Sequence, residues 1–146
     1  MNLIERQLVI GWAAAWVGLV SPGSGAAAEP AAPQSARTVA CSSTSTGGDL
    51  RAFTCPMGAT GTLQRFRFKA NFSGGHDDTM ASLTATLNGA PFACDAGSKT
   101  RLMGEDGEVS LECRISIQEK AGTQHVLGIV LLWSHAQYTD VELVSE

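Results

Sequence analysis

The sequence predicts an all-β protein, an antiparallel β-sandwich or small barrel of about eight to nine short strands that two disulfides brace. Apolar and polar residues alternate along several segments, and Gly, Pro, Asn and Asp separate these segments at short intervals. No helical periodicity follows residue 28, and the chain has four cysteines, an even number. This combination is typical of small exported β domains.

The N-terminal segment predicts export. Residues 8–20 carry no charge, and a Ser-Pro-Gly break and an alanine triplet ending at Ala28 follow them. This arrangement is typical of a secretory signal peptide, whereas a membrane-spanning helix needs about 20 apolar residues. We expect a signal peptide at 1–28, a flexible Pro/Ala leader at 29–36 and one domain at 37–146. The mature protein would have no transmembrane anchor and would be periplasmic or secreted.

The charge balance excludes one class of partner. The chain has 10 Lys and Arg against 14 Asp and Glu, a formal net charge of −4, without a run of like charges. Nucleic-acid binding needs a concentrated basic surface, so no nucleic-acid partner is expected.

The cysteines predict a disulfide framework. No two of them lie within four residues of each other, although structural zinc sites usually use such close pairs. Of the three possible connectivities we predict the two local bridges, each stabilising by about 3 kcal/mol through loop closure. The predicted pairs are Cys41–Cys55 and Cys94–Cys113.

The first half of the domain predicts three strands. Residues 37–41 and 50–55 form two short strands around a Ser/Thr/Gly loop at 42–49, and Pro56 ends the second strand. The clearest pattern follows at 64–72, where aromatic and cationic residues alternate and predict a half-buried strand. The inward positions are Phe66, Phe68, Ala70 and Phe72, and the cations between them are Arg65, Arg67 and Lys69.

A hairpin is expected next. Residues 80–88 alternate between small polar and apolar side chains, and Asn88-Gly89 is a typical two-residue turn in which both residues take positive φ. The returning strand, 91–94, begins with a proline and therefore lies at a sheet edge. Residues 95–98 turn, 99–103 form a short strand, and 104–107 turn again.

The C-terminal part predicts three more strands. Polar and apolar residues alternate at every position of 108–117, with Cys113 on the inward side. Residues 138–144 form the last strand. Residues 126–133 are apolar on both faces, with Gly128 marking a bulge or a close backbone approach. Such a strand is either central and covered on both sides, or it takes part in an interface. In the second case Val126 to Trp133 is the surface through which a homo-oligomer would form.

A glycine pair precedes His76, Asp77 and Asp78, which are candidate ligands of a divalent cation. If successive strands are antiparallel, the loops at 73–79, 95–98 and 118–124 share one end of the domain. Asp95 and His125 would then lie near these residues, and the 104–107 turn would lie at the opposite end with His135. The alternative is a solvated turn in which an aspartate hydrogen-bonds its own backbone.

The second candidate is a polar binding surface. If strands 64–72 and 80–88 pair, their outward side chains form a cationic row beside hydroxyl groups, suited to a protein or an envelope glycan. The residues are Arg65, Arg67, Lys69, Thr84 and Thr86. The alternative is cross-strand pairing of the cations with Glu108 and Glu112.

Sequence motifs do not favour catalysis. The chain has neither a Gly-x-Ser-x-Gly nor a His-Glu-x-x-His motif. We therefore expect an exported, non-catalytic β-sandwich that acts by macromolecular binding or structural interaction. The alternatives are a metal- or small-ligand-binding module centred on His76, Asp77 and Asp78, and a secreted hydrolase inhibitor. No cofactor is expected apart from that divalent cation.

Overall fold

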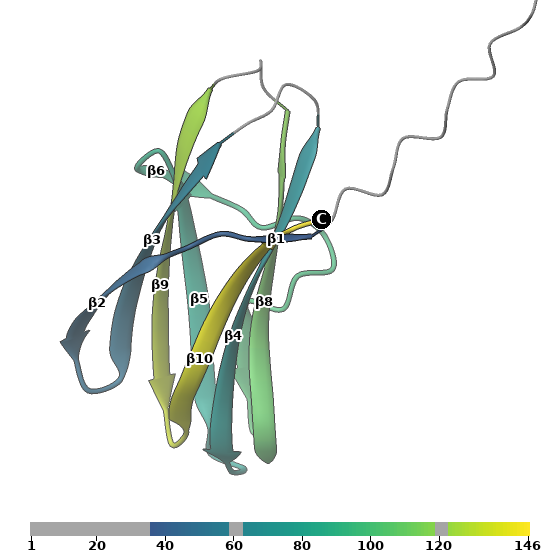
Figure 1. The fold of residues 1–146 in the computed structure, drawn as a ribbon. Coiled ribbons are helices and arrows are strands. Elements are labelled where there is room, and N and C mark those ends of the chain that lie inside the picture. Colours follow the sequence, from purple (N-terminus) through teal and green to yellow (C-terminus); the bar gives the residue numbers. More distant parts are fainter. Residues whose placement is uncertain (1–35, 59–62, 119–122) are drawn as a thin grey trace, which may run out of the picture. The chain divides into compact units, whose positions relative to one another are not determined.

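The structure, a computed structural model, describes residues 36–58, 63–118 and 123–146, all within one compact unit, Ala32–Glu146. Two antiparallel sheets pack face to face in this unit (Figure 1). The predicted β-sandwich with two disulfides is thereby confirmed. The predicted signal peptide and residues 29–35 of the leader lie outside the described residues.

Ten strands make up the two sheets in the described part of the chain. The four-stranded sheet has the order β1 (Arg37–Thr38), β10 (Gln137–Ser145), β4 (Gln64–Gly75) and β8 (Gly107–Ile117). The six-stranded sheet has the order β2 (Ser42–Gly47), β3 (Leu50–Gly58), β9 (Gln124–Ser134), β5 (Met80–Leu87) and β6 (Ala90–Phe92). Its sixth strand, β7 (Arg101–Met103), pairs with β5 on the same edge as β6.

The core lies between the sheets and includes the predicted inward positions of β4, β5 and β8. Every second residue of β4, β5, β8 and β9 is buried, since one face of each strand packs on the other sheet. Aromatic rings join the layers: the ring centroids of Phe53 and Phe68 are 5.9 Å apart, and those of Phe72 and Trp133 are 5.7 Å apart.

Both disulfides form as predicted, Cys41–Cys55 and Cys94–Cys113. The second connects the segment after β6, which belongs to one sheet, to β8 in the other. It therefore links the two layers covalently. Two disulfides suggest an oxidising, extracellular environment.

Residues 42–47 are a strand, β2, so the expected loop at 42–49 is wrong for most of its length. β1 and β2 form one continuous ribbon that leaves the edge of one sheet and joins the edge of the other (Figure 1). All six β2 residues are exposed. Because neither face of β2 is buried, its sequence carries no alternation that would have marked it as a strand.

Pro56 does not end β3, which continues to Gly58. Opposite Pro56 the strand has a neighbour only in β9, because β2 begins opposite Thr54. A proline is tolerated in a strand where its missing N–H has no partner to lose.

The predicted Asn88-Gly89 hairpin is confirmed, with φ angles of 53° and 81°. The Asn88 side chain also fastens β9 to this turn: its Oδ1 accepts the Val126 N–H at 2.9 Å, and its Nδ2 lies 2.9 Å from Nδ1 of the buried His125. Since Oδ1 is the acceptor, Nδ2 donates to the imidazole.

Candidate functional site

The predicted Arg/Lys/Thr surface does not form. β4 and β5 belong to different sheets, so Arg65, Arg67 and Lys69 lie on one outer face of the sandwich. Thr84 and Thr86 lie on the opposite outer face. β4 pairs instead with β8 and β10, strands that are distant from it in the sequence.

Acidic residues balance the cations on the four-stranded sheet. In register, Lys69 lies between Glu112 and Glu142, and Arg67 Nε is 3.4 Å from Glu146 Oε1. The charged residues on this face are Arg65, Arg67, Lys69, Arg114, Glu108, Glu112, Asp140, Glu142 and Glu146. Of the predicted cross-strand pairs with Glu108 and Glu112, the register brings Lys69 opposite Glu112. The ion pairs described on this face are Arg67–Glu146 and, within β8, Arg114–Glu112, and exposed pairs of this kind are worth little energy.

The His76 loop is fixed mainly by a buried threonine. Thr79 Oγ1 accepts the His76 N–H at 2.6 Å and donates to the His135 carbonyl at 2.7 Å. Asp78 Oδ2 lies 2.7 Å from His135 Nδ1, and both side chains are about 60% exposed. The loop is thus a solvent-exposed turn that Thr79 ties to the β9–β10 turn.

The expected grouping of loops around His76 is wrong. Asp95 accepts a hydrogen bond from Ser116 beside β8, and His125 lies beside the Asn88 turn. β6 and β7 both run antiparallel to β5 along one edge, so the turn at 95–98 does not reverse the chain. The 104–107 turn and the turn at His135 therefore lie at the end opposite to the expected one, beside the His76 loop.

The described residues contain no group of three or more His, Cys, Asp or Glu that is arranged to hold a metal. The Asp78–His135 pair involves neither the His76 nor the Asp77 side chain, although both residues belong to the same turn. The geometry therefore offers no support for the predicted divalent-cation site.

β9 has one buried face and one exposed face. It is central in its sheet, as one reading of its sequence predicted, but only its inner side is covered. On its outer side Val126 is 44%, Val130 41% and Leu132 53% exposed. Gly128 interrupts this row. The strand has no bulge there, since Gly128 stays in register with Thr54 and Thr86. A glycine is needed at this position because Thr86 Oγ1 occupies the space that a Cβ would take.

Almost no charge surrounds these residues. We call the outward-facing side chains of β3, β5, β7 and β9 the low-charge face. Its members include Leu50, Ala52, Thr54, Pro56, Met80, Ser82, Thr84, Thr86, Arg101, Met103, Val126, Val130 and Leu132. Among the outward-facing residues described on these strands, Arg101 is the single charged one. The two outer faces of the sandwich therefore differ sharply in charge.

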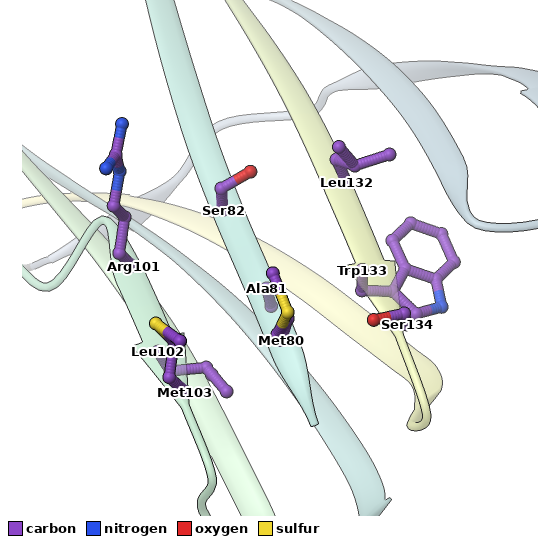
Figure 2. Close-up of a pocket in the computed structure, with 9 residues that line it drawn as sticks. All are labelled: Met80, Ala81, Ser82, Arg101, Leu102, Met103, Leu132, Trp133 and Ser134. Atoms are coloured by element: carbon purple, nitrogen blue, oxygen red, sulfur yellow. The ribbon is translucent and has the colours of Figure 1, made fainter. Parts of the chain in front are cut away.

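A pocket with a volume of about 410 Å³ opens at one corner of this face. Three neighbouring strands form it, with Arg101 and Met103 on β7, Met80 and Ser82 on β5, and Leu132 on β9 (Figure 2). Sequence reasoning missed this pocket because it depends on the pairing of β7 with β5. The one signal was the presence of methionines at the solvent-facing positions 80 and 103.

No protein-family model, curated protein or solved structure matches this chain. In the described ranges no helix is long and apolar enough to cross a bilayer. Function is therefore argued from the geometry of the two outer faces.

Proposed function

We propose that this chain is an exported, non-catalytic β-sandwich protein that binds another macromolecule through its low-charge face. The observation that carries the proposal is the contrast between the two outer faces. One carries nine charged residues of both signs, and the other carries Arg101 alone among its described outward-facing residues.

Exposed apolar residues lie along the central strand of this face, with Gly128 between Val126 and Val130. Single exposed apolar side chains are ordinary, whereas contiguous apolar patches rimmed by polar groups mark interaction sites. Val126, Val130 and Leu132 occupy the central strand, and serine and threonine hydroxyls flank them on β5 and β3. Interface centres are likewise depleted in charge, so this face fits the centre of a protein–protein contact.

The charged face is suited to remain in water. Burying its nine charged residues, among them the pairs Arg67–Glu146 and Arg114–Glu112, against a partner would cost desolvation energy. Docking on the low-charge face carries little of that cost, because Arg101 is the single charge and lies on β7 at the side of the sheet.

Export is supported by the two disulfides, which persist in oxidising compartments. The uncharged segment at residues 8–20 and the small residues up to Ala28 supply the expected targeting signal. Mass spectrometry of the protein from the periplasm or medium should give a chain beginning near Glu29 with no free thiol. A full-length reduced chain in the cytosol would contradict export.

The docking proposal is tested with a photo-cross-linking amino acid at Thr84 and, as the matched control, at Lys69. Thr84 lies opposite Val130 on the low-charge face, and Lys69 is central on the charged face. In cells of the native host we expect a specific adduct from position 84 alone. The adduct mass separates a second copy of the chain from a different macromolecule.

A further substitution makes this result specific. Val130→Glu places a charge at the centre of the low-charge face without entering the core, since Val130 is 41% exposed. It should abolish the adduct while leaving the fold unchanged by circular dichroism. An adduct that forms equally at both positions, or that survives Val130→Glu, would overturn the proposal.

A further inference from the structure

The pocket on the low-charge face has an apolar end. Met80 and Met103 line it and are 53% and 75% exposed. Leu132, 53% exposed, lines the pocket from β9, opposite Ser82. Met80 and Met103 are register partners on β5 and β7, so their side chains stand next to each other. Methionine side chains are flexible and polarisable, and they adapt to apolar ligands of varied shape.

The other end of the pocket is cationic. Arg101 is the register partner of Ser82, two residues along β7 from Met103. In Figure 2 Arg101 lies farther along β7 from Met103, Ser82 lies farther along β5 from Met80, and Leu132 lies on β9 beyond Ser82. Within the described part of the chain the Arg101 side chain has no hydrogen-bond or ion-pair partner.

From this arrangement we infer that the pocket binds a single-chain amphipathic carboxylate, of which a medium-chain fatty acid is the simplest example. The carboxylate pairs with Arg101, and the Ser82 hydroxyl stands beside it as a second donor. The alkyl chain lies against Met80, Met103 and Leu132.

Each part of the ligand follows from the lining. A planar guanidinium matches a carboxylate in a two-point contact, and the pocket has no second charged residue that would favour a dianion. A volume of about 410 Å³ lies in the range of small-ligand sites. The site occupies one corner of the low-charge face and does not depend on macromolecular docking there.

Calorimetric titration of the mature protein with octanoate, decanoate and dodecanoate, all below their micelle concentrations, tests the inference. Affinity should rise by up to about fourfold for each added methylene until the chain fills the pocket. Decanol, which lacks the charge, and decyltrimethylammonium, which reverses it, should each bind about tenfold more weakly than decanoate.

Substitutions of exposed residues test the charged and the apolar contacts of the ligand separately. Arg101→Gln should weaken decanoate about tenfold and leave decanol unchanged, whereas Leu132→Ser should weaken both. The matched control is Arg65→Gln, which removes an exposed cation from the opposite outer face and should change neither affinity. A cooperative thermal unfolding transition shows that each variant is folded.

Several results would overturn the inference. They are no binding of decanoate at millimolar concentration, equal affinity for decanoate and decanol, or an Arg101→Gln variant with unchanged decanoate affinity. A peptide ending in leucine with a free carboxylate serves as a competing ligand. If it binds more tightly than decanoate, the occupant is a chain terminus and not a fatty acid. Loss of the position-84 adduct concerns macromolecular docking and leaves these titrations unaffected.

Discussion

Two adjacent leucines on β9 provide a direct test of the low-charge face. Leu131 is fully buried between the sheets, at 0% exposure, and Leu132 points outward at 53% exposure. The substitutions Leu131→Ala and Leu132→Ala remove the same atoms from the same strand. They differ only in the face of the sheet from which the atoms are removed.

The structure sets the expected magnitudes. Truncating a leucine to alanine removes about three methylene-sized groups, worth roughly 2.4 kcal/mol when fully buried. At Leu131 the cavity adds to this, because Leu83 on β5 fixes the neighbouring space, and we expect a loss of about 3–4 kcal/mol. At Leu132 about half of the side chain is already in water, so the loss should be about 1 kcal/mol without a cavity term.

Urea denaturation, followed by tryptophan fluorescence, measures both values. Each variant is unfolded at two protein concentrations that differ about a hundredfold. For a monomer the midpoint does not depend on concentration, and the slope of the transition stays constant if only stability changes. Self-association through the low-charge face would raise the wild-type midpoint with concentration, and Leu132→Ala would remove that dependence.

Equal losses from the two substitutions at the lower concentration would refute the reasoning. Leu132 would then be covered within the monomer, and the low-charge face would not be a surface. A loss of less than 2 kcal/mol at Leu131 would equally contradict the assignment of the core.

Two further predictions concern the covalent and hydrogen-bonded links of the fold. Changing Cys94 and Cys113 together to serine should cost about 3 kcal/mol by urea denaturation, since the bridge closes a loop of 19 residues in sequence separation; an unchanged midpoint would mean that the bridge is absent from the exported protein. Asn88→Ala should cost about 1 kcal/mol more than Asn88→Gly, because both lose the same hydrogen bonds but alanine also strains the φ of 53°. Equal losses for these two variants would show that the turn relaxes its backbone.

Local patterns predicted the strands and the core well. Period-two alternation identified the inward residues of β4, β5 and β8, because a strand with one buried face has apolar residues at every second position. For β9, which is apolar on both faces, it did not distinguish the inner side. The same reasoning failed for β2, where all six residues are exposed and no alternation exists. Alternation arises only where one face of a strand is buried, and β2 is an edge strand with no buried face.

The candidate sites depended on information that local patterns do not hold. A surface formed from Lys69 and Thr84 required β4 to pair with β5, and a cation site required Asp95 to lie near His76. Neither requirement is met. β4 pairs with β8 and β10, and the chain runs in the same direction before and after the turn at 95–98. Which loops meet is decided by the path of the chain through both sheets.

By itself, then, the sequence determined the all-β class, the strands with a buried face, the tight turn at Asn88 and the two cysteine pairs. Each of these follows from local periodicity, from turn chemistry or from short loop closure. Only the tertiary structure decided that β9 keeps one apolar side exposed, and that Arg101 and Met103 stand beside Met80 at a pocket. Which strands pair depends on packing between residues far apart in the chain. The residue pattern within one strand therefore does not predict which strand will lie beside it.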